Sequence, residues 1–192
     1  MSAAKTLLPS DWAVAALEAI ATDGVDKLSI ERLAKQLGVT KGSFYWHFAD
    51  RAALITAATE EWERQATDEV ISALSEIADP RQRLRSLFEV SFGDDALGPI
   101  DTALASRADD PLLGEIVRRV TAKRLASLES IFAEIGFTPT IARRQARIAY
   151  AAYLGHFQMA SALADDDNIL GGGRSAYLDQ MVHTLAREST SR

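Results

Sequence analysis

Apolar residues recur with a helical period along nearly the whole 192-residue chain, and no convincing run alternates as a strand would. Two stripes near the N-terminus follow the i, i+3, i+4, i+7 spacing of a helix packed on one face. The first stripe comprises Ala13, Ala16, Leu17 and Ile20, and the second comprises Ile30, Leu33, Ala34 and Leu37. The pattern therefore predicts an all-α protein.

Short polar residues and glycines mark the ends of these two helices. Ser10 and Ser29 stand where N-caps are expected, because a serine hydroxyl can accept a hydrogen bond from the first helical turn. Gly24 and Gly38 follow the last apolar residues, as C-terminal glycines do. A third, short helix is expected to begin at Thr40.

Proline and glycine divide the rest of the chain into longer helices. Asp50 is expected to begin a long helix that ends at Asp79-Pro80, and Gly136 is expected to end another. The expected ranges after the third helix, which runs to about residue 48, are approximately 50–78, 80–92, 100–107, 110–136, 138–163 and 175–187. This organisation predicts a three-helix head over residues 1–50 and a larger helical domain over residues 51–192.

The charge distribution favours one segment for contact with a polyanion. The net charge is −6, which argues against loose binding to nucleic acid. Between Asp26 and Arg51, however, five basic residues face three acidic ones, so this segment carries +2. The chain has no cysteine, which excludes disulfides and thiolate metal sites.

The same segment has the layout of a helix-turn-helix, in which two short helices meet at a tight turn. Gly38 accepts the positive backbone angle that the turn needs, and the small Ala34 allows the helices to approach closely. Val39, Phe44 and Phe48 supply apolar contacts that set the angle between them. The third helix is therefore expected to present its polar side to a partner.

That polar side carries groups suited to a DNA duplex. Thr40 is expected to cap the helix, whose N-terminus then favours a phosphate. Lys41 can reach base edges or phosphate, and Gly42 lets the backbone come near the groove. Arg51 lies near a positive helix end, where a structural role would be unusual, so an external anion is its expected partner.

The run from Gly38 to Phe48, GVTKGSFYWHF, followed by Arg51 and Leu54, resembles the signature of the tetracycline-repressor (TetR) family. The resemblance implies base-edge contacts by Lys41, Gly42 and either Tyr45 or Trp46. For Trp46, a mixed role in packing and contact is an open alternative. The resemblance also implies phosphate contacts by the residues Ser29, Thr40, Ser43, Tyr45, His47 and Arg51.

For the larger domain the resemblance implies a small-molecule pocket and a dimer surface on the last two helices. The candidate pocket residues are apolar or aromatic, although ordinary core packing explains each of them equally well. They are Trp62, Phe88, Phe92, Leu104, Tyr153 and Phe157, with the segment from Gly93 to Pro99 as a gate. The candidate dimer residues are Ile148, Ala152, Gly155, Leu178, Met181, Val182 and Leu185.

Other polar clusters receive structural interpretations. His156 and His183 are expected in the core or an interface, and the acidic run 165–167 beside glycines 171–173 in a solvated loop. The basic residues of 118–124 and 143–147 are expected on solvated faces. No catalytic set, cofactor motif or metal-ligand spacing stands out, so no cofactor, metal or enzymatic activity is expected.

Together these features predict a cytoplasmic, ligand-responsive transcriptional regulator that is not inserted in a membrane. Its expected partners are double-stranded operator DNA of near-palindromic sequence, a second copy of the chain, and a small, largely apolar or aromatic effector. Repression is the expected outcome. The alternatives are a helical small-molecule-binding protein or enzyme that only retains the head, and a protein-interaction scaffold.

Overall fold

The computed structural model describes residues 7–93, 97–163 and 173–187, in which every regular element is helical. The elements are α1 (Pro9–Asp23), the 3₁₀ helix η1 (Val25–Lys27), α2 (Ile30–Leu37), α3 (Lys41–Phe44), α4 (Arg51–Glu63), the π-helix η2 (Arg64–Asp68), α5 (Glu69–Ser75), α6 (Pro80–Ser91), α7 (Gly98–Ala105), α8 (Gly114–Ile135), α9 (Pro139–Ala162) and α10 (Arg174–Leu185). The prediction of an all-α fold is confirmed.

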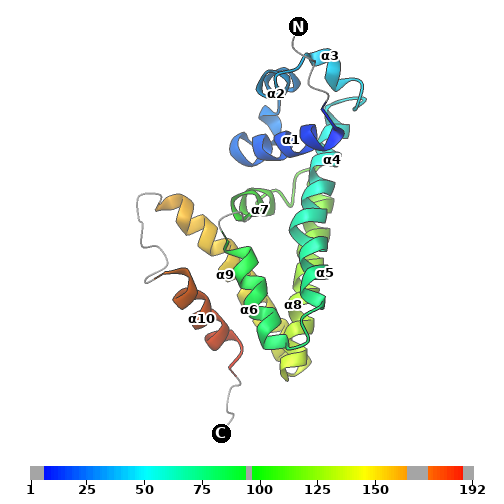
Figure 1. Cartoon of the computed structure of the whole chain (residues 1–192). Helices are drawn as coiled ribbons and strands as arrows, with labels where there is room; N and C mark the ends of the chain where they lie inside the picture. The colour runs from blue at the N-terminus through cyan, green and yellow to red at the C-terminus, as the bar shows by residue number, and fades with distance from the viewer. Residues whose placement is uncertain (1–6, 94–96, 164–172, 188–192) are drawn as a thin grey trace.

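The head, formed by α1, α2 and α3, occupies one end of the molecule (Figure 1). Helix α4 leads away from the head and continues through η2 into α5, while α8 runs beside this column (Figure 1). Helix α7 lies between the head and the remaining helices, where it contacts both α1 and α9. Among the described helices, none is long and apolar enough to cross a membrane.

Local signals located most helix ends correctly. Gly38 adopts φ +72° at the end of α2, and the Asp50 side chain accepts a hydrogen bond from the Ala53 amide at 2.8 Å. Asp79 likewise caps α6 ahead of Pro80. These positions match because capping needs only a short polar side chain, or a glycine, at the correct step of the chain.

Several expected boundaries are wrong, and three of them have a local cause or consequence. Helix α1 begins at Pro9 rather than after Ser10, because the Leu8 amide bonds the Asp11 carboxylate at 2.7 Å and starts the helix earlier. Helix α3 ends at Phe44, and Thr40, although it precedes the helix, makes no capping bond through its hydroxyl. Helix α8 begins at Gly114, after a turn over the Asp110 carboxylate.

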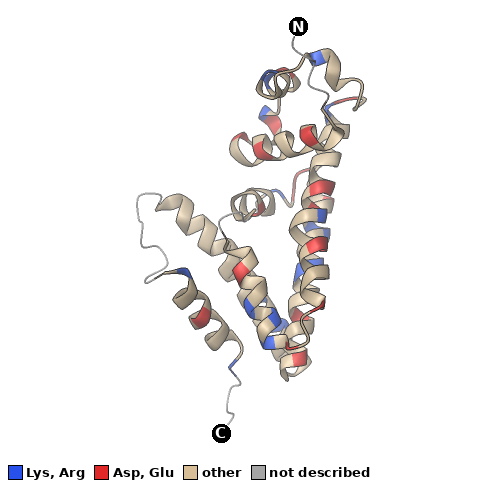
Figure 2. Ribbon diagram, in the orientation of Figure 1, with Lys and Arg blue, Asp and Glu red and all other residues tan. Residues whose placement is uncertain are grey.

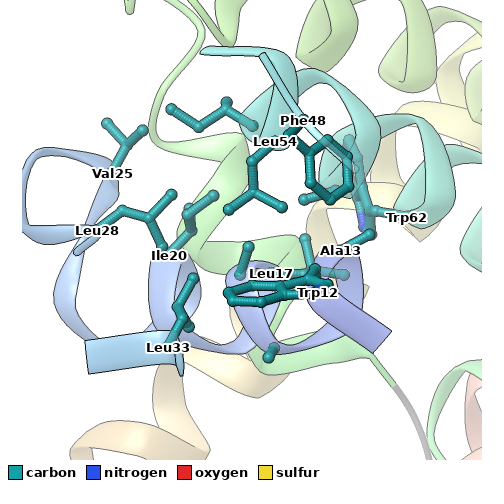
Figure 3. Close-up of a cluster of buried hydrophobic side chains, with 14 of the residues drawn as sticks. Trp12, Ala13, Leu17, Ile20, Val25, Leu28, Leu33, Phe48, Leu54 and Trp62 are labelled. Carbon is teal, nitrogen blue, oxygen red and sulfur yellow. The ribbon is translucent and has the colours of Figure 1, made fainter. Parts of the chain in front are cut away.

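The hydrophobic core of the head extends beyond the head itself (Figure 3). Trp12 and Leu33 are almost fully buried at its centre, together with Leu54 and Trp62 from α4. The same cluster includes side chains of α7 and the first turns of α8, among them Leu104. The head and the start of the larger domain are therefore packed as one unit, and a division at residue 50 stays a prediction.

A second core joins α6, α8, α9 and α10 at the other end of the molecule. Its largest members are Phe88, Phe92 and Phe132, and small alanines of α9 such as Ala146 allow the helices to approach closely. Between the two cores, buried Gly98 brings α7 against α9, since a Cβ on Gly98 would lie 2.1 Å from the Phe157 ring.

Candidate nucleic-acid interface and ligand cavity

Aromatic packing anchors the short helix α3 to the head. The Phe44 side chain is fully buried, with its ring centroid 5.4 Å from that of Trp12 and 5.5 Å from that of Phe48. The Trp12 indole N–H is buried without a hydrogen-bond partner in the described part of the chain. Trp12 therefore contributes to the head through packing alone.

The opposite side of α3 and the turn after it face solvent. The Trp46 side chain is 88% exposed and that of Tyr45 is 56% exposed, which rules out the alternative that Trp46 takes part in packing. Ser29, Thr40, Lys41 and Gly42 are also exposed, whereas Ser43 and His47 are half-buried. The structure thus brings these residues to one end of the head, and their contacts with DNA stay predictions.

An acidic residue that the sequence analysis overlooked lies beside Lys41. The Lys41 ammonium forms an ion pair with the Glu31 carboxylate of α2 at 2.7 Å, and both side chains are at least half exposed. The hydrogen bond between the two groups, together with the attraction of their opposite charges, lowers the pKa of Glu31 and raises the pKa of Lys41. Glu31 thereby holds the Lys41 ammonium near α2.

Arg51 has a structural role that the sequence analysis considered unusual. Its half-buried guanidinium donates hydrogen bonds to the backbone carbonyls of Leu28, at 3.1 Å, and Val25. These carbonyls belong to the link between α1 and α2, so Arg51 fixes that link to the start of α4. An additional phosphate contact by Arg51 stays a prediction.

A cavity of about 440 Å³ lies between the two cores. Phe88 and Tyr153 line it as expected, together with Asp101 and Arg124, which were not expected there. The other lining residues are Arg64, Gln65, Ala66, Thr67, Glu69, Val70, Ile71, Leu87, Val90, Ser91, Leu97, Ser127, Leu128, Ala149 and Tyr150. Its volume is within the range of small-molecule pockets.

Four of the expected pocket residues are not part of this lining. Trp62 and Leu104 belong to the core of the head. Phe92 and Phe157 stack on each other with centroids 6.0 Å apart. Apolar aromatic residues can fill a core as readily as they line a cavity, so side-chain type did not separate the two roles.

The buried carboxylate of Asp101 connects four helices. One oxygen accepts hydrogen bonds from the Trp62 indole at 2.5 Å and from Arg124 at 3.0 Å. The other accepts from Arg124 at 2.8 Å and from the Tyr153 hydroxyl. Asp101 lies on α7, so this single carboxylate ties α7 to α4, α8 and α9.

The guanidinium of Arg124 completes this network. It also donates to the Thr67 hydroxyl at 2.9 Å and to the Ala66 carbonyl at 3.1 Å, both in the π-helix. Burial alone would lower the pKa of Arg124, but the charge and hydrogen bonds of Asp101 outweigh it and raise the pKa. Burial beside Asp101 also raises the pKa of Tyr153.

The expectation of a solvated basic face on α8 is therefore wrong for Arg124, whose side chain is largely buried, whereas Arg118 and Arg119 are exposed as expected. Arg124 occupies the inward stripe of the helix, and Arg119 and Lys123 bind the buried Glu63 carboxylate of α4 at 2.6 and 2.8 Å. These bonds lower the pKa of Glu63 to about 2, chiefly through the hydrogen bond from Arg119, against the opposing effect of burial.

Only part of the expected dimer surface is accessible. Leu178 and Leu185 are buried in the second core of their own chain, which corrects their assignment as dimer contacts. Ile148 is 54% exposed, and a Cβ on Gly155 would meet nothing within 4 Å. Ala152, Met181 and Val182 are half-buried. The half of α9 from Ile148 onward carries no Lys, Arg, Asp or Glu (Figure 2).

The remaining expectations concern single residues and loops. His156 is buried as expected, and burial lowers its pKa, whereas His183 is exposed. Residues 94–96 of the expected gate, and the acidic and glycine runs at 165–167 and 171–172, lie outside the described residues. Within the described ranges, no group of three or more His, Cys, Asp or Glu could hold a metal ion.

Comparison with known proteins connects this arrangement to a family. Residues 14–70 match the model of the bacterial regulatory proteins of the tetR family. The BetI transcriptional regulator of Yersinia pestis (strain Pestoides F) is 30% identical over 148 residues, which cover 73% of this chain and 72% of BetI. This chain belongs to the TetR family. The family assignment drawn from the Gly38–Phe48 run is confirmed.

Other relatives match this chain over shorter stretches. The class A tetracycline repressor of transposon 1721 from Escherichia coli is 41% identical over 54 residues, 28% of this chain. That match spans only a quarter of the tetracycline repressor's own length, and the match to YvdT of Bacillus subtilis spans 29% of that protein. This chain therefore shares less than a third of its length with each of these two regulators.

Solved structures share the whole TetR-family fold. A TetR regulator of Legionella pneumophila has a TM-score of 0.73 at 13% identity, covering 96% of each chain. FadR of Bacillus subtilis, in complex with stearoyl-CoA, has a TM-score of 0.69 at 18% identity and covers 92% and 97% of the two chains. A Saccharomonospora viridis regulator in complex with choline has a TM-score of 0.68 at 19% identity and covers 92% of each.

Replacing Arg51 should destabilise the head. Arg51→Ala leaves the carbonyls of Val25 and Leu28 without their donor, so we expect the free energy of unfolding in urea to fall by about 1–3 kcal/mol. Arg51→Lys should recover only part of this, because an ammonium cannot reproduce the guanidinium fork. Arg187→Ala, which removes an exposed arginine at the end of α10, is the control. Wild-type stability in Arg51→Ala would show that the carbonyl contacts contribute nothing.

The Glu63 network predicts a pH-dependent contribution to stability. Because the pKa of Glu63 falls from 4.5 to about 2 on folding, its contribution is complete above pH 4.5 and is lost as the pH falls toward 2. Glu63→Gln should therefore lower the free energy of unfolding by about 1–3 kcal/mol at pH 7, with a smaller difference at pH 3.

Urea unfolding at both pH values, monitored by circular dichroism, measures the effect of Glu63→Gln. Glu76→Gln is the matched control, because Glu76 is exposed and forms no ion pair with any described residue. A difference between wild type and Glu63→Gln that stays constant from pH 7 to pH 3 would contradict the lowered pKa.

Proposed function

We propose that this chain is a ligand-responsive transcriptional repressor that binds a near-palindromic operator as a homodimer. A small, largely apolar or aromatic effector that enters the cavity releases it from the DNA. The proposal extends the family assignment, which makes the chain a TetR-family transcriptional regulator.

The observation that carries the DNA-binding part is the two-sided character of the α3 region. Phe44 is fully buried while Trp46, two residues later, is 88% exposed. An exposed tryptophan lowers the solubility of a protein and is typical of an interaction surface. With Lys41 and Tyr45 beside it, the surface offers a cation, a hydroxyl and flat rings to a duplex groove.

The cavity supports the ligand-responsive part. It lies next to α7, whose Asp101 accepts a hydrogen bond from Trp62 of α4 at 2.5 Å. Helix α4 begins at Arg51, which is bonded to the head, so a shift of α7 can reach the head through α4. A ligand produces such a shift only if it binds the two arrangements with different affinity. Structural neighbours bound to stearoyl-CoA or choline fit a ligand-binding role for this region.

The outward face of α9 supports the dimer. Ile148 and Met159 are each about half exposed and the helix lacks charge over this stretch, so its burial against a second copy is favourable. Two copies of α9 and α10 would form a four-helix bundle around a two-fold axis. A two-fold dimer would place its two α3 helices in successive major grooves of a near-palindrome.

Binding to the DNA upstream of the protein's own gene tests the central claim. We expect a specific, salt-sensitive complex in fluorescence anisotropy, and Lys41→Ala should reduce the affinity ratio between operator and base-substituted operators roughly tenfold or more. Arg187→Ala, distant from the head, should leave this ratio unchanged. A selected-sequence experiment on random DNA should recover a near-palindrome.

One outcome would oppose the proposed function, and another would change only the role of Lys41. If the folded protein selects no sequence from random DNA, the head does not recognise an operator. That result would favour the alternative functions, an enzyme or a protein-interaction scaffold. If Lys41→Ala weakens binding to all sequences equally, Lys41 contacts phosphate rather than base edges.

The dimer interface predicts a second measurable effect. Ile148→Glu places a charge on the uncharged face of α9, and we expect it to convert the dimer to a monomer in sedimentation equilibrium. Leu112→Glu is a matched control, because Leu112 is equally exposed but precedes α8 on another surface. A monomeric wild type would reject the proposed homodimer. An Ile148→Glu protein that remains dimeric would move the interface away from this face of α9.

A further inference from the structure

The charged residues around the cavity neutralise one another. Four of its lining residues carry a charge, namely Arg64, Glu69, Asp101 and Arg124. Arg64 forms an ion pair with Glu69, and Arg124 forms one with Asp101. The four charges of the lining therefore sum to zero, and Arg64 also pairs with Glu61 outside the lining.

The Asp101 carboxylate has no free capacity for a cation. Both of its oxygens already accept two hydrogen bonds, from Trp62, Tyr153 and Arg124. A cationic ligand would have to compete with the guanidinium of Arg124, whose side chain is only 11% exposed. Placing a second cation beside that guanidinium in a buried site would cost free energy through repulsion and desolvation.

An anionic ligand would find few free hydrogen-bond donors on Arg124. This guanidinium already donates four hydrogen bonds, to Asp101, Thr67 and the Ala66 carbonyl. Of its five N–H groups, one remains for a ligand. An anionic ligand would also face the buried charge of Asp101 at close range, so a single neutral acceptor is the better match.

The rest of the lining suits an apolar body with a few polar atoms. Val70, Ile71, Leu87 and Leu128 contribute aliphatic surface. The hydroxyls of Ser91, Ser127 and Tyr150 have no hydrogen-bond partner among the described residues, so each can bond a ligand.

We infer that the cavity selects an electrically neutral ligand, mostly apolar with a few hydrogen-bonding atoms, and that the Asp101–Arg124 pair enforces this selection. The inference rests on the proposed function only in taking the cavity as the effector site. It narrows the effector to uncharged molecules that fit about 440 Å³ and disfavours quaternary ammonium compounds, carboxylates and phosphates.

Two fluorescent probes that share a ring system test the charge selection. N-phenyl-1-naphthylamine is neutral, and 8-anilino-1-naphthalenesulfonate carries one negative charge on the same skeleton. With the wild-type protein we expect saturable binding of the neutral probe at one site per chain, with at least tenfold lower affinity for the sulfonate. Equal or tighter binding of the sulfonate at the cavity would overturn the inference, as would no binding of the neutral probe.

A matched pair of variants shows whether the probe occupies the cavity. Ser127 lines the cavity and Ser130 is exposed on the same helix. Ser127→Trp fills the cavity and should abolish binding of the neutral probe, whereas Ser130→Trp should leave it unchanged. Equal effects of the two variants, or no effect of either, would place the probe elsewhere and contradict the inference.

A second pair of molecules tests rejection of cations. Neopentylbenzene and benzyltrimethylammonium have nearly the same shape. The quaternary carbon of the neutral neopentylbenzene is replaced by a positively charged nitrogen in benzyltrimethylammonium. The neutral compound should displace N-phenyl-1-naphthylamine, and the cation should not at tenfold higher concentration. Displacement by both with similar potency would show that the lining does not discriminate by charge.

Removing one charge of the pair should change the selectivity. Asp101→Asn keeps the shape of the side chain but leaves Arg124 uncompensated, so the ratio of the affinity for the sulfonate probe to that for the neutral probe should rise at least tenfold. Unchanged selectivity in a folded Asp101→Asn protein would overturn the role of the pair. If this variant does not fold, the probe comparisons with the wild-type protein decide whether the cavity selects neutral ligands.

These measurements need no operator DNA, so the two claims can fail separately. Loss of sequence-specific DNA binding with the probe selectivity intact would reject the proposed function and leave the cavity assignment standing. Specific DNA binding together with preference for a charged probe would reject the neutral-ligand inference alone.

Discussion

The carboxylate of Asp101 is the contact on which the arrangement of the larger domain depends. It sits on the short helix α7 and binds side chains from α4, α8 and α9. A buried carboxylate is tolerated only when its charge is paired and its oxygens are hydrogen-bonded, and Arg124, Trp62 and Tyr153 meet both conditions. This requirement favours the observed arrangement of the four helices, because it brings Trp62, Arg124 and Tyr153 together around Asp101.

This contact also places the cavity and the head in one mechanical unit. The first core contains the centre of the head, the inward side of α4 along its length and part of α7, and Asp101 of α7 lines the cavity. Arg51 joins the start of α4 to the link between α1 and α2. A change at the cavity wall can therefore reach the DNA-facing end through packed helices rather than through a flexible linker.

The π-helix between α4 and α5 contributes to this site in a way that side-chain patterns do not reveal. Residues 64–67 of this segment line the cavity, and its Ala66 carbonyl accepts a hydrogen bond from Arg124. Wider helical turns of this type often occur at functional sites because they alter the direction of neighbouring side chains. Apolar periodicity across residues 54–74 indicates a single helix, as the sequence analysis expected.

The sequence by itself determined the fold class, most helix ends and the residues at the tip of the head. Those features depend on local chemistry: a glycine at φ +72° for Gly38, a capping carboxylate for Asp50, and one buried ring at Phe44 beside polar neighbours. The tertiary structure alone decided which charges are buried and which apolar residues line the cavity. Arg124 belongs to a basic run that is typical of a solvated face, and only the position of Asp101, 23 residues earlier on another helix, makes its burial favourable. Ion pairs of this kind join residues that have no fixed spacing along the chain, so the periodicity of the sequence cannot predict them.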